Sequence, residues 1–223
     1  MAQIPDVLPV FSLPNLVLLP GSDLPVRIFD PAYVAMFKDI IEGDRMVLVC
    51  QMTQAWEEGQ SKTPELYDVG CIGVVTTYNE LEEGYTLFLR GLQRVNVLKD
   101  VSEEPYRRVQ VEMLQENDED QRSELILELR SKIMAKLLQT SCHEILGPFP
   151  DGSIDRLGQA SASNFVALLP LLLKVPPHDQ QRLLELNGLT ARLAELTHFI
   201  DQSLLKKATL GEPPLNEDGE YTH

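Results

Sequence analysis

The pattern of apolar residues changes once along this chain, near the acidic run Glu116–Asp120. Before that run, apolar residues come in short runs or alternate with polar ones, which is typical of β-strands. After it, they recur every three or four residues, which is typical of amphipathic helices. We therefore predict an α+β chain with a strand-rich part over residues 1–117, a helical part over 118–208, and a disordered acidic tail over 209–223.

The strand-rich part holds short apolar segments separated by Pro, Gly and acidic residues. Met46–Met52 is a continuous apolar run, as expected for a strand buried on both faces. In Tyr106–Met113, apolar residues alternate with polar ones, which predicts a strand with one wet face and with Val109, Val111 and Met113 on the other. The remaining predicted strands are Val7–Leu13, Leu24–Phe29, Val69–Tyr78, Tyr85–Leu89 and Gln93–Leu98, with a hairpin turn at residues 82–84.

One helix should interrupt these strands. Asp30 is a good N-cap residue, Pro31 suits the first helical position, and Gly43 stands where a C-cap glycine belongs. The apolar face of this helix consists of Tyr33, Phe37, Ile40 and Ile41.

The helical part shows four periodic or apolar segments. Ser123–Gln139 carries an apolar stripe, and Ser161–Leu173 is nearly all apolar, so it should lie in the middle of the lobe. Pro170 should kink that helix or end its regular part. Asp179–Leu186 predicts a short helix, and Thr190 is placed to cap a last one.

The net charge of −15, from 34 acidic and 19 basic residues, disfavours general nucleic-acid binding because phosphate backbones would be repelled. The three cysteines are far apart and odd in number, which fits a reducing compartment rather than a disulfide framework. The N-terminus lacks a basic segment before an apolar stretch, and no apolar run approaches the ~20 residues of a membrane span. We therefore expect a cytoplasmic protein.

The motifs that carry catalytic chemistry are missing. The sequence contains no phosphate-binding G-x-x-x-x-G-K-[ST], no G-x-S-x-G, and no H-E-x-x-H or C-x-x-C metal pattern. Cys142-His143-Glu144 suggests a nucleophile, but neighbouring helical side chains point about 100° apart, so we interpret it as incidental. The acidic run at 116–120 lacks the Gly and distal Glu of a calcium loop, so we interpret it as a solvated linker. We expect no cofactor and no metal.

The strand-rich part contains several arginines: Arg27, Arg90, Arg94, Arg107 and Arg108. They could form a small patch that contacts an anion or RNA. The alternative is scattered solvated strand faces with ion pairs to the acidic excess. Aromatic residues make up only 6% of the chain, which is thin for base stacking. The alternative of solvated faces is therefore favoured.

A series of motifs stands in a fixed order along the chain. The strand-rich part contains an apolar-Pro start, a Pro-Gly turn, a Leu-Tyr-x-x-Gly strand and a Gly-x-x-Arg strand. They stand here as Leu8-Pro-Val-Phe, Leu18-Leu-Pro-Gly21, Leu66-Tyr-Asp-Val-Gly70 and Arg90-Gly-Leu-Gln-Arg-Val95. The helical part adds the apolar helix, Asp179-Gln-Gln-Arg-Leu-Leu-Glu185 and Ala191-Arg-Leu193. No single motif is specific, but their order over about 200 residues resembles the N-terminal substrate-binding domain of Lon proteases.

This resemblance implies a twisted, PUA-like β pseudobarrel with one short helix, followed by a helical bundle. Full Lon enzymes continue into an ATPase and a Ser-Lys protease domain, and this chain stops where those would begin, so we expect neither activity. The role implied is non-enzymatic binding of unfolded or degron-bearing polypeptides. The alternative is an RNA- or nucleotide-associated module, because PUA-like folds include RNA binders. A third class, an enzyme with an unrecognised small-molecule site, rests on fold analogy alone.

Four residues in the matching segments are candidates for the binding surface: Arg27, Tyr67, Arg90 and Arg94. Each is long or amphipathic, so its stem can cover apolar surface while its head stays wet. Arg and Tyr are also enriched at the energetic centres of protein interfaces. In the competing interpretation, Arg27 and Arg90 tie neighbouring strands together and Tyr67 packs in the core.

Overall fold

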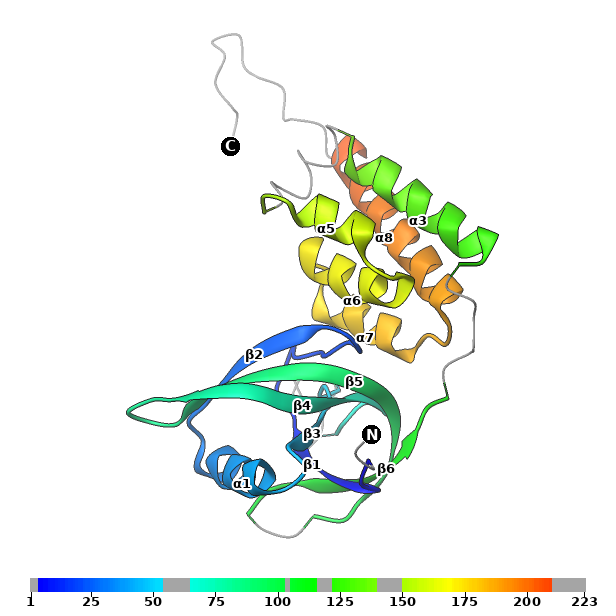
Figure 1. Cartoon of the computed structure of the whole chain (residues 1–223). Helices are drawn as coiled ribbons and strands as arrows, with labels where there is room; N and C mark the ends of the chain where they lie inside the picture. Colours follow the sequence, from blue (N-terminus) through cyan, green and yellow to red (C-terminus); the bar gives the residue numbers. More distant parts are fainter. Residues whose placement is uncertain (1–3, 54–64, 103–104, 116–121, 140–149, 210–223) are drawn as a thin grey trace.

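The computed structural model describes residues 4–53, 65–102, 105–115, 122–139 and 150–209 (Figure 1). It has two parts, a β-lobe (described residues 4–115) and a helical lobe (described residues 122–209). The helical lobe lies against one side of the β-lobe (Figure 1). In the sequence, residues 116–121 connect the two lobes. The predicted linker at 116–120, residues 210–223 of the predicted tail (209–223), and Cys142-His143-Glu144 fall outside the described residues.

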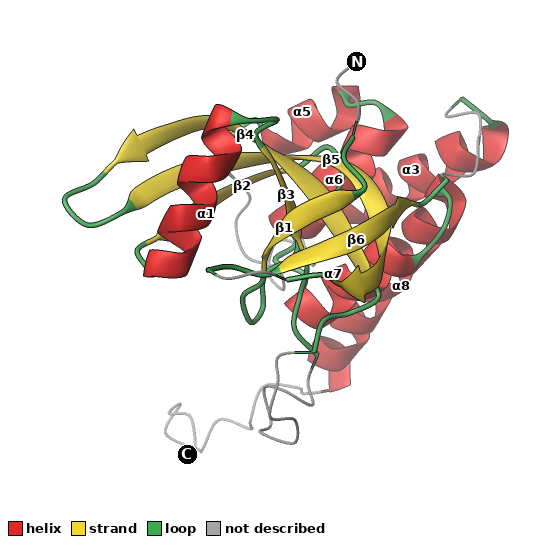
Figure 2. Cartoon of the chain, turned by 90° about the horizontal axis from the view of Figure 1, so that it is seen from below, coloured by secondary structure: helices red, strands yellow, loops and turns green. Residues whose placement is uncertain are grey.

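The β-lobe is a mixed sheet that closes on itself. Its strands are β1 (Val7–Phe11), β2 (Asp23–Ile28), β3 (Met46–Val49), β4 (Val69–Glu80), β5 (Tyr85–Asp100) and β6 (Arg108–Met113). The order is β2-β5-β4-β3-β1-β6, and β6 pairs with β5 as well as with β1. Among the described strands, β1 and β3 are the one parallel pair, and the other pairs are antiparallel. Figure 2 shows the resulting ring, from which the β4–β5 hairpin extends.

Helix α1 (Pro31–Glu42) covers the side of the β-lobe that faces away from the helices (Figure 1). Its start is confirmed, since the Asp30 carboxylate accepts hydrogen bonds from the backbone N–H groups of Ala32 and Tyr33. Phe37 and Ile40 are buried, and Tyr33 and Ile41 pack beside them, so the predicted apolar face is the one that contacts the sheet.

The strand predictions are confirmed in outline, with two differences. The segments predicted as Tyr85–Leu89 and Gln93–Leu98 form one long strand, β5, which bends at register shifts against β4. In β6, Val109 and Val111 are buried as predicted, but Met113 is 56% exposed. The prediction for Met113 is wrong because the strand ends there, beyond the interior that covers Val109 and Val111.

The helical lobe consists of α3 (Glu124–Leu137), α5 (Ser153–Gln159), α6 (Ala162–Leu172), α7 (Pro177–Glu185) and α8 (Leu189–Thr209). Helix α6 ends two residues after Pro170, as expected for a proline that ends the regular part. Helix α8 begins at Leu189, so the predicted cap at Thr190 is wrong by at least one residue. Helix α5 was not predicted, because only Leu157 of its seven residues is buried and no periodicity marks it.

The core has three clusters. One lies between the sheet and α1, one lies on the other face of the strands, and one fills the helical lobe. Helix α7 contributes to two of them: Leu183 belongs to the cluster of the helical lobe, while its neighbour Leu184 belongs to the first cluster of the β-lobe. The two lobes therefore share apolar packing through α7.

Within the described residues, no helix is both long enough and apolar enough to cross a membrane. The same residues contain no group of three or more His, Cys, Asp or Glu side chains that could hold a metal ion.

Candidate functional site

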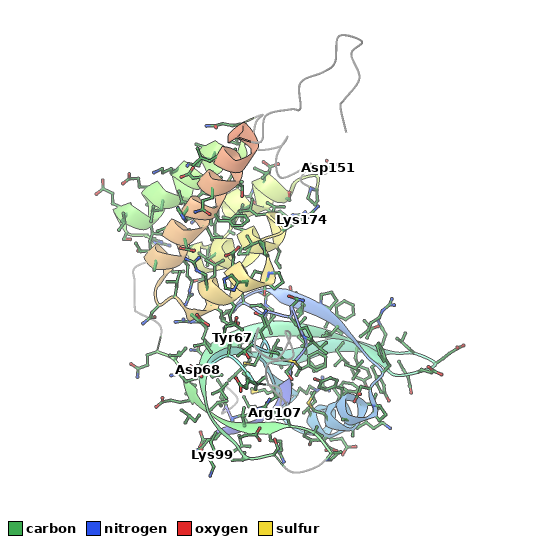
Figure 3. All side chains as sticks on the ribbon, turned by 180° about the vertical axis from the view of Figure 1, so that it is seen from behind. Tyr67, Asp68, Lys99, Arg107, Asp151 and Lys174 are labelled. Atoms are coloured by element: carbon green, nitrogen blue, oxygen red, sulfur yellow. The ribbon has the colours of Figure 1, made fainter. Side chains whose placement is uncertain are left out.

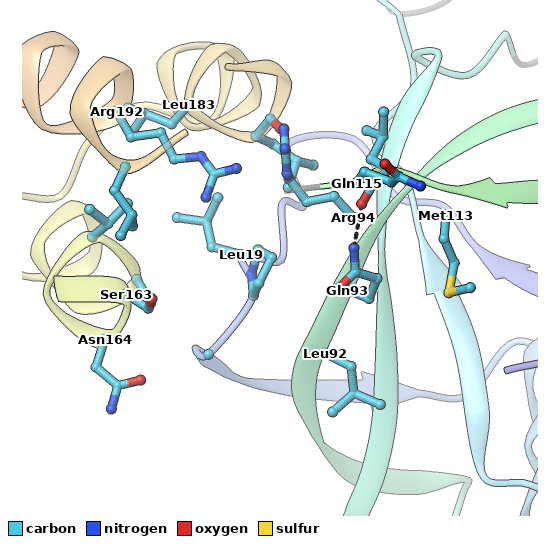
Figure 4. Close-up of a pocket in the computed structure, with 17 residues that line it drawn as sticks. Leu19, Leu92, Gln93, Arg94, Met113, Gln115, Ser163, Asn164, Leu183 and Arg192 are labelled. Atoms are coloured by element: carbon cyan, nitrogen blue, oxygen red, sulfur yellow. Dashed lines mark hydrogen bonds between the residues drawn. The ribbon is translucent and has the colours of Figure 1, made fainter. Parts of the chain in front are cut away.

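A groove of about 770 Å³ lies where the two lobes meet (Figure 4). That volume is in the range of protein ligand sites, roughly 300–1,000 Å³. We call it the interlobe groove. The β-lobe lines it with residues 19–21, 92–94 and 113–115, and the helical lobe with 163, 164, 166, 167, 183, 184, 189 and 192.

The Pro20–Gly21 turn forms one wall of the interlobe groove, and it lies very close to α6. Gly21 has a φ of +86°, a left-handed conformation that L side chains rarely adopt. A Cβ on Gly21 would lie 3.3 Å from Asn164 Oδ1 and 3.4 Å from the Ala167 Cβ. The Pro-Gly signal in the sequence therefore marks a turn that also brings the strand lobe against the first turns of α6.

Arg94 holds the two lobes together beneath the groove. It is 1% exposed, and its guanidinium donates hydrogen bonds to the carbonyl oxygens of Leu184 and Leu186, both at 2.8 Å. It also donates to Asn187 Oδ1 at 3.1 Å. The planar fork of arginine can serve several acceptors at once, which a lysine cannot do in the same geometry. Arg94 thus fixes the end of α7 and the turn before α8 against β5.

Apolar side chains project into the interlobe groove from the β-lobe. Leu92 on β5 is 41% exposed and Met113 at the end of β6 is 56% exposed. In Figure 4, Leu92 lies below Gln93, and Met113 lies to the right of Gln93, on the side away from the helices. Gln93 is held by a hydrogen bond from its Nε2 to the carbonyl oxygen of Leu114, at 2.6 Å. The groove therefore offers adaptable apolar surface beside a fixed polar rim.

The helical wall of the groove carries a second arginine, Arg192, on the first turn of α8. It is 8% exposed, and its Nε donates a hydrogen bond to the Leu186 carbonyl oxygen at 3.0 Å. Figure 4 shows its guanidinium extending from α8 toward Leu19 on the opposite wall. No signal in the sequence distinguishes Arg192 as a groove residue, since it stands there within the family motif Ala191-Arg-Leu193.

The structure does not bring the four sequence-predicted residues together. Of these, Arg94 alone lines the interlobe groove, and it is buried rather than at a wet border. Arg27 is exposed on β2, and Arg90 pairs with Asp23 at 2.7 Å across β2 and β5. Tyr67 is half-buried against the strand cluster of the β-lobe, where Figure 3 shows it beside Asp68. The contacts of Arg90 and Tyr67 are thus those expected if both residues are structural, as in the competing interpretation. A binding role for the four residues remains a prediction.

The two described cysteines are core residues, as their place in apolar strands predicted. Cys50 and Cys71 are both buried, and desolvation raises the pKa of each thiol to about 12. A thiol must ionise to act as a nucleophile, so neither is suited to catalysis near neutral pH.

These raised pKa values predict a loss of stability at alkaline pH. The thiols stay neutral in the folded protein up to about pH 12, whereas the unfolded chain ionises them above the ordinary pKa of 9.0. Stability is therefore fully present below pH 9 and is lost as the pH rises from 9 toward 12, by about 1.4 kcal/mol per thiol at pH 10. Urea unfolding at pH 8 and 10 measures the loss, and the Cys50→Ala/Cys71→Ala variant should lose about 3 kcal/mol less than the wild type. If the free energy of unfolding fell equally with pH in the two proteins, the loss could not be assigned to Cys50 and Cys71.

Comparison with known proteins agrees with this architecture. The family model for the ATP-dependent protease La (LON) substrate-binding domain matches residues 7–202. Lon protease 2 of Myxococcus xanthus and Lon protease of Anaeromyxobacter dehalogenans are each 28% identical, over 90% of this chain and 24% of their own length. The chain thus spans about a quarter of the length of these curated relatives.

Two solved structures share the fold. The N-terminal domain of the Mycobacterium avium complex Lon protease superimposes with a TM-score of 0.65 at 18% identity, over 87% of this chain and 98% of that one. A Lon N-terminal domain protein from Xanthomonas campestris gives 0.59 at 21% identity, over 86% and 98%. At these identities the likeness establishes the fold alone.

Proposed function

This chain belongs to the ATP-dependent protease La (LON) substrate-binding domain family, and from that premise we propose that it is a non-enzymatic module that binds polypeptides in its interlobe groove. The observation that carries the proposal is the exposure of Leu92 and Met113 within a groove that both lobes build. Exposed apolar side chains in a concave site are typical of surfaces that bind other chains. The partners would be unfolded or degron-bearing polypeptides, in the cytoplasm.

Binding through side chains is better supported than addition of a strand to the sheet. Among the described strands, β2 forms the edge, since it pairs only with β5. Its middle residue Pro25 has no backbone N–H, and Asp23 and Arg27 put charges on either side. Proline and charge at an edge oppose pairing with another strand. The other strands pair within the ring, so the groove remains as the place for contact.

We propose for this chain the substrate-recognition role of Lon enzymes, and not their ATP hydrolysis or proteolysis. The sequence has no phosphate-binding loop, and the matched relatives are four times as long. The alternative, a PUA-like module that binds RNA or a nucleotide, is less well supported. The chain carries a charge of −15, and much of the interlobe groove is apolar.

The proposal predicts that Leu92→Asp weakens the capture of unfolded polypeptide. A carboxylate at this position would have to be desolvated against the apolar segment of the partner, which costs several kcal/mol. We expect affinity for fluorescein-labelled casein to fall about tenfold or more, measured by fluorescence anisotropy. Because Leu92 is already 41% exposed, the melting temperature should change little.

Leu81→Asp is the matched control. Leu81 is 42% exposed, like Leu92 at 41%, but it lies in the β4–β5 hairpin and does not line the groove. This variant should bind casein as the wild type does. Equal losses in the two variants would place the binding surface elsewhere or show that it is non-specific, and no binding by the wild type would overturn the proposed function.

A further inference from the structure

A second groove adjoins the interlobe groove at the end of β6. Its volume is about 400 Å³, and it is lined by residues 4–6, Leu98, residues 111–113 and Gln115. We call it the second groove. Met113 and Gln115 line both grooves, and in Figure 4 Met113 lies on the side of the strands away from the helices. The two grooves therefore meet at the end of β6.

The two exposed leucines of β5 both occupy register shifts. Leu92 is skipped in the pairing of β5 with β4, and Leu98 is skipped in the pairing of β5 with β6. They are 41% and 54% exposed. An extra residue in one strand disrupts the ladder locally and re-aims a side chain, and such irregularities are common beside functional sites. Leu92 lines the interlobe groove and Leu98 the second groove, so each groove receives one exposed leucine from the same strand.

The backbone around the second groove is held in place. The Leu114 N–H donates a hydrogen bond to the carbonyl oxygen of Arg94 on β5, at 3.0 Å. The Val111 N–H donates to the carbonyl oxygen of Asp6, at 2.9 Å, and so holds the N-terminal segment that lines this groove. Met113 lies between these two bonds and is 56% exposed, with an unbranched side chain that adapts its shape. A fixed frame with adaptable apolar side chains suits the binding of varied sequences.

We propose that the second groove is a second apolar subsite, and that one extended polypeptide segment occupies both grooves. One apolar anchor of the segment contacts Leu92, another contacts Leu98, and the chain between them passes over Met113. The inference rests on the proposed function and specifies its substrate class, which is segments with two apolar clusters separated by a short polar spacer. Leu98 follows Leu92 by six residues, which is at most roughly 20 Å along a strand, and an extended segment of about six residues covers that length.

Two anchors on one chain bind more tightly than either anchor alone. Once the first anchor is bound, the second is held near its own groove at a high effective concentration. The spacer must be long enough to let both anchors bind, so affinity should depend on the spacing as well as on the number of apolar residues. Charge is a separate influence, because Asp6 and Glu112 line the second groove and none of its described lining residues is basic. The test therefore uses uncharged peptides.

Two peptides of identical composition test the spacing. Each has twelve residues, four leucines in a background of Ser and Gln, and acetylated and amidated ends. The spaced peptide carries its leucines at the third, fourth, ninth and tenth positions, and the contiguous peptide carries them at the fifth to eighth. We expect the spaced peptide to bind about tenfold more tightly, measured by isothermal titration calorimetry. General hydrophobicity cannot produce this difference, because the two compositions are the same.

Leu98→Asp should weaken binding of the spaced peptide about tenfold and leave the contiguous peptide unchanged, so that the two bind equally. Leu125→Asp is the matched control. Leu125 is 52% exposed, lies in the first turn of α3, where an acidic residue favours the helix, and lines neither groove. This variant should bind both peptides as the wild type does.

Equal binding of the two peptides by the wild type would overturn the inference and leave the proposed function intact. A preference for the spaced peptide that survives Leu98→Asp would also overturn it, because the second anchor would then bind elsewhere. Failure of casein and of both peptides to bind would overturn the proposed function itself. If Leu98→Asp lowers the melting temperature by several degrees, Leu98→Ser replaces it, since serine removes the apolar side chain without adding charge.

Discussion

Replacing Arg94 with methionine is expected to lower the stability of the protein by about 3–5 kcal/mol, because the carbonyl oxygens of Leu184 and Leu186 would lose their donor while remaining at a buried contact. Each unsatisfied buried acceptor costs about 1–3 kcal/mol, and Asn187 loses a partner as well. For a protein of this size, the melting temperature should fall by roughly 10 °C. Thermal unfolding followed by circular dichroism measures the change.

Arg90→Met is the control for this prediction. Arg90 lies on the same strand as Arg94, but its ion pair with Asp23 is open to solvent, with side chains 40% and 64% exposed. Such surface pairs contribute about 0–1 kcal/mol, so the melting temperature should fall by only a few degrees or less. If the two variants melt together, Arg94 does not hold the lobes.

Gly91→Ala is expected to have an effect of similar size by a different cause. A Cβ on Gly91 would lie 2.2 Å from the carbonyl oxygen of Leu19, far inside contact distance. The backbone cannot move aside easily, because Gly91 N–H donates to the Ser22 carbonyl and the Gly91 carbonyl accepts from Gly21 N–H, both at 2.9 Å. Overpacking against backbone should cost about 3 kcal/mol or more, measured as a shift of the urea midpoint.

Gly158→Ala provides a control with the opposite sign. Gly158 lies in α5, and a Cβ there would meet only the terminal methyl group of Met134, at an ordinary 3.5 Å. Alanine restricts the unfolded chain and favours the helix, so stability should rise by about 0.4–1 kcal/mol. If Gly91→Ala unfolds at the same urea concentration as the wild type, the prediction is wrong. The backbone at Leu19 would then be able to shift and make room for the added methyl group.

Local features of the fold could be predicted from the sequence because local residues decide them. The Asp30 cap, Pro31 and Gly43 defined the ends of α1, and the Glu82–Gly84 turn defined the β4–β5 hairpin, where Gly84 has a φ of +98°. The run predicted as a buried strand, Met46–Met52, forms strand β3 over Met46–Val49, and residues 46–51 are buried. Each of these signals lies within a few residues of the element it defines.

The site was harder to predict, since it is made by the contact of two lobes. Arg90 and Arg94 are alike in composition and neighbourhood, yet one lies half in solvent and the other is buried against α7. Nothing within β5 specifies which arginine faces the other lobe. Leu92 and Met113 read as ordinary strand residues, and only their exposure beside the helices makes them candidates. The pairing of β6 with both β1 and β5 also depends on residues far apart in the sequence, so the alternation of apolar and polar residues within β6 could not predict it.

That double pairing has a consequence for the order in which the protein is made. On the ribosome, β1 is synthesised first, but its two neighbours are β3 and β6, and the second of these ends only at Met113. Until then the nascent chain carries open strand edges on β1 and β5, both rich in apolar residues, which are prone to pairing with other chains. Closure of the ring is therefore a late event that joins segments about 100 residues apart, and such non-local steps are slow.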